Sequence, residues 1–119
     1  MIQKGSILST GDNSGVLKTR IFHVYRGSKG RIGLVGDFLK VSAREVLPEN
    51  PILKKSKHKA IVIRTKYKNI RKDGSFIFFN KNILILLKKR LTPKSTLLRG
   101  SITKNIRRKK FLSSFTKII

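Results

Sequence analysis

The sequence predicts a mainly β protein built around a small closed barrel. Residues 38–46, FLKVSAREV, alternate apolar and polar side chains with period two, the pattern of a half-buried strand. Residues 60–65 are apolar enough to form a central strand, and ILILL at 83–87 is expected to form a further strand. Because turn signals separate these short segments at close spacing, we expect them to close into a barrel.

Two further elements and a loop are expected before residue 38. The segment DNSG combines Asx side chains, which bond nearby backbone, with a glycine, and its structural turn residues are Asp12, Asn13 and Gly15. Residues 16–26 are rich in β-branched and aromatic side chains, which favours a strand. GSKGRIG at 27–33 contains three glycines and is expected to be a loop.

Beyond residues 60–63, a β-ribbon hairpin is expected to project from the barrel. Alternation along an extended chain places Arg64, Lys66 and Lys68 on one side. In KDGS, Asp73 and Gly74 are predicted to form a two-residue type I′ turn, after which SFIFFN returns as the second strand. Such a ribbon would hold its basic side chains at defined positions.

The C-terminal end is expected to form short helices. Two apolar pairs are each spaced by four positions, as on one face of a helix: Ile102 with Ile106, and Phe111 with Phe115. The continuously basic residues 107–110 separate the pairs, so two short helical turns are predicted. With no repeat or linker, 1–119 is interpreted as a single domain, with a barrel at about 1–100 and a helical basic end at about 101–119.

Charge is the strongest indication of a partner. The chain has 29 Lys and Arg against 5 Asp and Glu, giving a formal net charge of +24, and this self-repulsion destabilises a compact fold unless a polyanion binds. Residues 54–119 contain 21 of these basic residues and one acid. Nucleic acid is the first candidate and an acidic membrane surface the second. No apolar run reaches the roughly 18 residues of a membrane span, and the N-terminus lacks the apolar region of a signal peptide.

Catalysis, metal binding and cofactor binding are not expected. The chain has no cysteine, which excludes thiolate zinc sites and cysteine nucleophiles. Asp12, Asp37 and Asp73 lie beside or near glycines and are assigned to turns. His23 and His58 lack the carboxylate or thiol companions that a metal site needs. The glycines of GRIGLVG lack the strand-to-helix context of a phosphate loop.

The basic clusters supply the candidate RNA-binding residues. Residues 54–72 contain nine basic residues in nineteen and no acid, and that many phosphate contacts would make binding fall steeply with salt. Aromatic side chains nearby are expected to be core more often than base-stacking groups: Tyr67, Phe76, Phe78 and Phe79. The candidate RNA contacts are Lys54, Lys55, Lys57, Lys59, Arg64, Lys66, Lys68, Arg71, Lys72, Arg99, Lys104, Arg107, Arg108, Lys109 and Lys110.

Several segments together resemble a known family, ribosomal protein L-fourteen of the large subunit. The segments that carry the resemblance, in matching order and spacing across nearly the whole chain, are MIQ, DNSG, VGDFLKVSAREVLP, KAIVIRT, DGSFIFFNKNILIL and GSITKNIR…KF. The chain departs from the family at Ile85, where Val is usual, and at Ser95-Thr96-Leu97, where Gly-Thr-Arg is usual. Ser101 replaces a Pro, and Lys104-Asn105-Ile106-Arg107 replaces Arg-Glu-Leu-Arg.

The resemblance implies a five-stranded barrel with a projecting ribbon, a helical C-terminal end and no enzyme activity. It implies a structural role in the large ribosomal subunit during translation: binding to large-subunit rRNA, and contact with small-subunit rRNA through intersubunit bridges. The implied protein partners are ribosomal proteins L-three and L-nineteen and a ribosome silencing factor, with no membrane. The missing Glu puts in doubt any protein contact that it makes elsewhere in the family, whereas the extra lysines suggest added contact with RNA or acidic protein.

Composition indicates an organelle-encoded protein of the mitochondrial ribosome, in the mitochondrial matrix. Ile, Lys, Asn and Phe, which have A/T-rich codons, make up 47 of 119 residues, and Ala appears only twice. The chain also starts at the family's own first residue, so no presequence is expected. A plastid protein, or a bacterial cytoplasmic protein from an A/T-rich genome, fits the composition nearly as well.

Two other functions share the charge. A free OB-like RNA-binding protein or RNA chaperone should cluster aromatic residues on one exposed strand face, whereas here the aromatics are expected to be mostly internal. A cationic membrane-active protein needs a strongly amphipathic basic helix, and the only candidate, at the C-terminal end, is short and broken.

Overall fold

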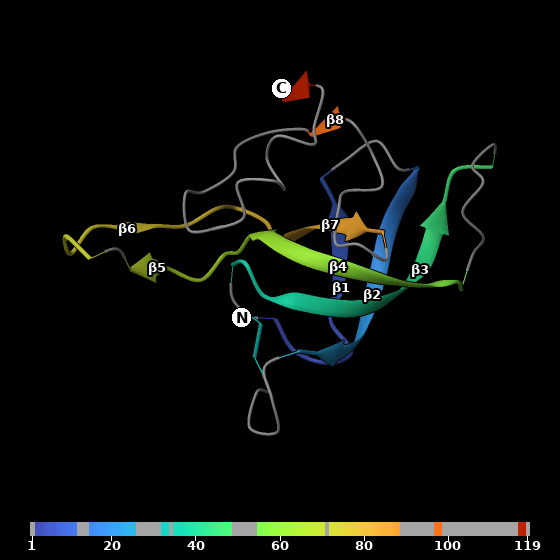
Figure 1. Cartoon of the computed structure of the whole chain (residues 1–119), viewed down its shortest axis with the longest axis horizontal. Coiled ribbons are helices and arrows are strands. Elements are labelled where there is room, and N and C mark those ends of the chain that lie inside the picture. The colour runs from blue at the N-terminus through green and yellow to red at the C-terminus, as the bar shows by residue number, and fades with distance from the viewer. Residues whose placement is uncertain are drawn as a thin grey trace.

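Five strands close into a barrel in the computed structural model, which describes residues 2–11, 15–25, 32–33, 35–48, 55–70, 72–88, 97–98 and 117–118. The barrel strands are β1 (Ile7–Thr10), β2 (Val16–Val24), β3 (Phe38–Val46), β4 (Lys57–Arg64) and β7 (Ile83–Leu87). Neighbouring strands are antiparallel, except that β1 and β7 close the barrel as a parallel pair (Figure 1). The predicted barrel is therefore confirmed.

The interior of the barrel is built by period-two patterning, which β3 shows most clearly. Leu39, Val41 and Ala43 are fully buried, whereas Lys40 and Ser42 between them are partly exposed. The buried cluster inside the barrel consists of Ile, Leu, Val and Ala among the described residues, with no aromatic ring. A barrel of five strands has a narrow interior, and aliphatic side chains suffice to fill it.

Residues 60–63 of β4 and residues 84–87 of β7 are buried on both faces. Ala60 and Val62 of β4 lie in the interior cluster, while Ile61 and Ile63 belong to a second cluster on the outside of the same strand. Residues 84–87 of β7 divide in the same way, and every side chain in both four-residue runs is at most 2% exposed. The predicted strand at 83–87 is confirmed, and the predicted central strand at 60–65 is present as β4, which spans Lys57–Arg64.

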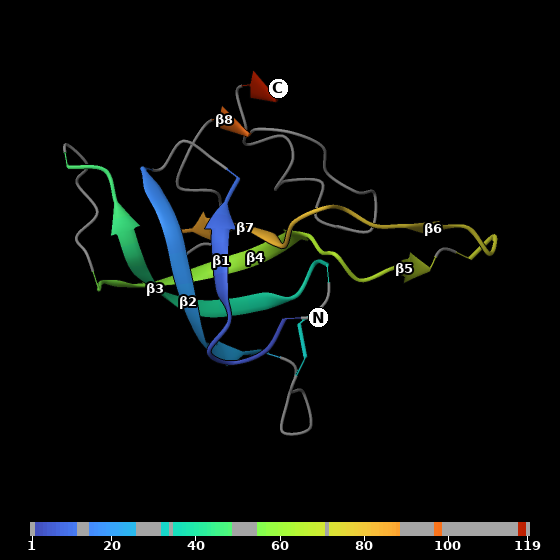
Figure 2. The same ribbon diagram turned by 180° about the vertical axis from the view of Figure 1, so that it is seen from behind.

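A two-stranded ribbon extends from the barrel between β4 and β7 (Figure 2). Its strands are β5 (Asn69–Ile70) and β6 (Phe76–Ile77), paired antiparallel. The predicted two-residue type I′ turn is wrong, because Ile70 pairs with Phe76 and five residues therefore separate the paired positions. Within the described residues Lys55 is the only non-glycine with positive φ, so Asp73 lacks the φ that a type I′ turn requires.

The turn of the ribbon is held instead by a side chain. One carboxylate oxygen of Asp73 accepts hydrogen bonds from the Ser75 backbone nitrogen at 3.0 Å and the Ser75 hydroxyl at 2.6 Å. This is an Asx-type arrangement, in which a side chain replaces a backbone acceptor. Gly74 has a φ of 87°, so the predicted positive φ at this residue is confirmed. The other predicted turn has Gly15 at φ 88°, while Asp12 and Asn13 lie outside the described residues.

Two short strands lie outside the barrel. They are β8 (Leu97–Leu98) and β9 (Lys117–Ile118), which pair in parallel. The predicted helical turns around residues 102–106 and 111–115 fall outside the described residues. The described part contains strands and no helix, so a mainly β fold is the observed class.

At Gly11 the chain that follows β1 passes close to side chains of β7 and β4. Its backbone nitrogen donates to the Leu84 carbonyl at 3.0 Å. A Cβ placed on Gly11 would lie 2.8 Å from Cγ2 of Ile83 and 3.1 Å from Cδ1 of Ile63. The Ile83 methyl is attached directly to a branched carbon, so it cannot swing away by rotating a distal bond.

We expect Gly11→Ala to lower the free energy of unfolding by about 1–3 kcal/mol, because the new methyl group overpacks this contact. Urea denaturation followed by circular dichroism measures the change. In an Ile83→Ala background the penalty should largely disappear, since the clashing methyl group is gone. An equal penalty in both backgrounds would contradict this steric explanation.

Candidate nucleic-acid interface

The basic stretch at 54–72 does not form one surface. Strand β4 runs through the middle of it, with Lys57 and Lys59 near one end and Arg64 at the other. Lys66, Lys68 and Lys72 lie beyond Arg64 on the ribbon, which extends away from the barrel in both views (Figures 1 and 2). The structure therefore separates the predicted RNA contacts into two groups. The ribbon group consists of Lys66, Lys68 and Lys72, and the sheet group consists of Lys57 and Lys59 on β4. Arg64 lies at the end of β4 between the two groups.

The ribbon group is solvent-exposed. The side chains of Lys66, Lys68 and Lys72 are all exposed to solvent. The Nζ atom of Lys68 lies 4.4 Å from the ring centroid of Phe76, close enough for a cation–π interaction. Phe76 also stacks against Phe78, with ring centroids 6.2 Å apart. One side chain of the ribbon group is thus positioned by an aromatic ring.

The root of the ribbon is fixed by specific hydrogen bonds. The Phe79 backbone nitrogen donates to the Thr65 carbonyl at 3.0 Å, and the Thr65 hydroxyl donates to the Tyr67 carbonyl at 3.0 Å. The Lys66 backbone nitrogen donates to Oδ1 of Asn82 at 2.8 Å. Thr65 is fully buried, so the chain leaves the barrel in one defined direction. Thr65 and Asn82 position the ribbon, a role that the sequence patterns did not indicate.

Arg64 differs from the exposed lysines. It is partly buried at the end of β4, and desolvation by the surrounding protein lowers the pKa of its guanidinium below the ordinary value for arginine. One of its terminal nitrogens would lie 3.7 Å from a Cβ on Gly11, so the side chain packs beside the barrel wall. A planar guanidinium in such a place is suited to bidentate contacts with phosphate.

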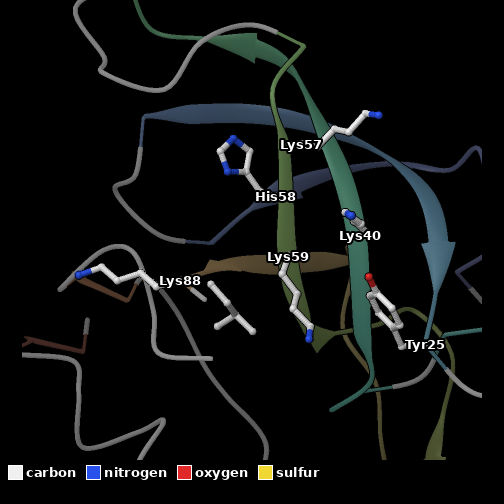
Figure 3. A pocket seen from close by; sticks show the side chains of 7 residues that line it. Tyr25, Lys40, Lys57, His58, Lys59 and Lys88 are labelled. Atoms are coloured by element: carbon white, nitrogen blue, oxygen red, sulfur yellow. The ribbon is translucent and has the colours of Figure 1, made fainter. Parts of the chain in front are cut away.

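The sheet group lies on the outside of β2, β3 and β4. Lys57 and Lys59 of β4 are neighbours of Lys40 on β3, because Lys40 pairs with Lys59. These three lysines contribute to a hollow of about 750 Å³, shown in Figure 3. The hollow is lined by Tyr25, Lys40, Lys57, His58, Lys59, Leu87 and Lys88. None of the carboxylates in the described part of the chain lines it.

Most aromatic side chains of the described residues are exposed, whereas the sequence patterns predicted that they would be internal. Phe22 and Tyr25 are about 40% exposed, and Tyr67, Phe76 and Phe78 are more than half exposed. Phe79 is partly buried, and no aromatic residue is among the fully buried side chains of the described chain. The expectation that aromatics are mostly internal is therefore wrong, because the narrow barrel is filled by aliphatic residues.

The remaining predicted contacts cannot be assigned to either group. Lys55 is exposed just before β4, with a φ of 67° and its backbone nitrogen bonded to the Ala43 carbonyl at 2.7 Å. The candidates outside the described residues are Lys54, Arg71, Arg99, Lys104, Arg107, Arg108, Lys109 and Lys110.

The described residues contain no group of three or more His, Asp or Glu side chains placed to hold a metal ion. They also contain no helix of the length and hydropathy needed to cross a membrane. Hydrogen bonding at His58 is to a neighbouring hydroxyl, with its Nε2 atom 2.6 Å from Oγ of Ser56.

Sequence comparison identifies the family. The model of ribosomal protein L14p/L23e matches residues 1–119. The chain belongs to this ribosomal protein family. It is also 45% identical over 115 residues to the large ribosomal subunit protein uL14m of Tetrahymena pyriformis, a match that covers 97% of each chain. The resemblance inferred from the sequence is therefore confirmed. Members of the L14p/L23e family are structural components of the ribosome and not enzymes.

The Asx-type turn predicts how the ribbon responds to substitution at Gly74. No atom lies within 4 Å of a Cβ built there, so Gly74→Val should act through backbone strain at positive φ, costing the ribbon about 1–2 kcal/mol. Amide hydrogen exchange should accelerate at Ile70 and Phe76 but not in β4. Gly74→Asn is the control, because Asn tolerates positive φ better. Unchanged exchange in the Val variant would show that the turn does not require this conformation.

Proposed function

We propose that this protein is a structural constituent of the large subunit of a mitochondrial ribosome, where it binds large-subunit rRNA. Membership of the L14p/L23e family supports the ribosomal role. The similarity to uL14m of Tetrahymena pyriformis, a mitochondrial ribosomal protein, supports the large subunit and the mitochondrial matrix. The composition rich in Ile, Lys, Asn and Phe supports an organelle-encoded gene.

The observation that carries rRNA binding is the ribbon with its fixed root. Lys66, Lys68 and Lys72 are held outside the barrel by a segment whose exit is bonded at Thr65 and Asn82. Charges on a fixed support reach defined phosphates of a folded RNA, whereas charges on a mobile tail neutralise phosphates without selecting them. Phosphate contacts of this kind set the orientation of the protein on its RNA.

The partners that we propose follow from the family. In addition to large-subunit rRNA, they are small-subunit rRNA across intersubunit bridges, ribosomal proteins L-three and L-nineteen, and a ribosome silencing factor. The basic candidates Lys104 and Arg107 to Lys110 fit contact with small-subunit rRNA by charge. Lys104-Asn105-Ile106-Arg107 lacks the family's usual Glu, so we do not assign that segment to a protein partner.

A free OB-like RNA-binding protein or RNA chaperone is the second candidate, and one observation favours it. Exposed aromatic residues do occur along β2, since Phe22 lies in this strand and Tyr25 follows it directly. A free RNA chaperone would be recovered apart from ribosomes, whereas a ribosomal constituent sediments with the large subunit and leaves it only at high salt.

We expect reversal of the ribbon charges to prevent assembly without unfolding the protein. Lys66, Lys68 and Lys72 changed together to Glu should leave the barrel intact, because all three are exposed, and should replace phosphate attraction by repulsion. The matched control changes Lys4, Arg20 and Arg44 to Glu, which are also exposed and alter the net charge equally. Circular dichroism measures folding, and quantitative mass spectrometry of sedimented large subunits measures incorporation.

The ribbon variant should be depleted from large subunits, on the order of tenfold or more, as expected for the loss of several charge contacts. The control should be incorporated nearly normally. Equal depletion of the two folded variants would mean that only net charge matters, and the positioned ribbon would then have no special role. Absence of the parent protein from large subunits would overturn the ribosomal function itself.

A further inference from the structure

The outside of β2, β3 and β4 brings aromatic and cationic side chains together on one surface. We call this surface the outer sheet face and define it by Phe22, Tyr25, Phe38, Lys40, Lys57 and Lys59. The side chains of Phe22, Tyr25 and Lys57 are exposed to solvent. Those of Phe38, Lys40 and Lys59 are partly exposed. Five of the six residues lie on the neighbouring strands β2, β3 and β4, and Tyr25 directly follows β2.

The lysines of this face are placed against the aromatic rings. Nζ of Lys59 lies 5.2 Å from the Tyr25 ring centroid and 5.7 Å from that of Phe38. Nζ of Lys57 lies 5.7 Å from the Phe22 ring centroid. Distances within about 6 Å are those of cation–π interactions. The charges and rings therefore form one preorganised array and not a scatter of independent surface residues.

Tyr25 stands at the edge of the hollow beside this face. Its ring packs edge-to-face on His23, with centroids 4.5 Å apart, and this contact orients it. Figure 3 shows the side chain of Lys59 on the same side of the sheet as Tyr25, with Lys40 on the adjacent strand β3. The ring remains 42% exposed, so part of its apolar surface is available to a ligand. The hollow of about 750 Å³ falls within the range of small-molecule sites and is large enough for a nucleotide.

We propose that the outer sheet face binds an unpaired nucleotide of RNA, with the base against Tyr25 and the adjoining phosphates at Lys40, Lys57 and Lys59. This inference rests on the proposed rRNA-binding function and adds the class of RNA that this surface takes. It concerns a surface separate from the ribbon. The ribbon binds phosphates through exposed lysines, whereas this face also offers a ring on which a base stacks.

Two physical arguments select an unpaired nucleotide. A base inside a duplex is covered on both sides by its neighbours, so a protein ring stacks only on bases that are single-stranded, bulged or splayed. Phosphate alone would account for the lysines but not for the exposed rings among them. An acidic protein segment would also satisfy the lysines, yet it lacks the planar groups that pair with an exposed tyrosine ring.

Tyrosine fluorescence reports directly on the proposed contact. The chain has two tyrosines and no tryptophan, so Tyr67→Phe leaves Tyr25 as the single emitter. The full-length variant is titrated with single-stranded oligoadenylate of about eight nucleotides, a length within the range of sheet-based binders. Duplex RNA and inorganic polyphosphate, which carry the charge without an accessible base, are titrated in parallel. Oligoadenylate should quench most of the emission, and the other two should leave it nearly unchanged.

Substitution of Tyr25 separates stacking from charge. Tyr25→Leu should weaken oligoadenylate binding on the order of tenfold, the range measured for loss of one base-stacking ring. Tyr25→Phe retains the ring and should bind nearly as the parent does. Neither change alters the charge, so the affinity for duplex RNA should stay within about threefold. Circular dichroism confirms that each variant is folded.

Three results would overturn the proposal. They are equal quenching by polyphosphate, oligoadenylate binding that does not respond to Tyr25→Leu, and tighter binding of polyglutamate than of oligoadenylate at equal ionic strength. The last result would assign the surface to an acidic protein. None of them bears on incorporation of the protein into large subunits, so failure here is distinguishable from failure of the ribosomal function.

Discussion

Burial of both faces of β4 and β7 is the constraint on which the rest of the structure depends. Ala60 to Ile63 and Leu84 to Leu87 contact the barrel interior on one side and a second apolar cluster on the other. A strand covered on both sides cannot shift its register without moving apolar side chains out of two clusters at once. The ribbon begins where β4 ends, so the direction of the ribbon is inherited from this wall.

The same wall explains how a chain of such high charge supports the two separate RNA-binding surfaces that we propose. The net charge of +24 produces repulsion throughout the molecule, and only the apolar interior and bound polyanions oppose it. The apolar half of β4 connects the outer sheet face to the ribbon and resists a shift of register, so it sets the spacing between the lysines of these two surfaces. Two sets of charges at a set spacing favour binding of a folded RNA over binding of a flexible polyanion. The flexible polyanion loses conformational entropy when it contacts both sets of lysines, whereas a folded RNA is already ordered.

Much of this fold follows from the sequence, and the exceptions have physical causes. The strand at 38–46 and the strand at 83–87 have the bounds that alternation and apolar runs indicate. The exposed aromatics were missed because hydrophobicity alone does not show that a narrow barrel is already full. The turn was misassigned because Asp73-Gly74 fits a two-residue hairpin, whereas the Asp73 side chain instead bonds Ser75. Separation of residues 54–72 into two surfaces depends on where β4 lies in three dimensions, which local patterns do not contain.

The parallel pairing of β1 with β7 bears on how the nascent chain folds. It joins Ser9 and Thr10 to Ile83 and Leu84, so the barrel cannot close until most of the chain has been synthesised. Until then, β1 and β4 are unpaired edges on a partly folded chain, and such edges recruit other chains. The excess of lysine and arginine works against that encounter, because two nascent copies repel each other before their edges meet. The charge that favours the RNA binding proposed above therefore also opposes association of the chains while they are being made.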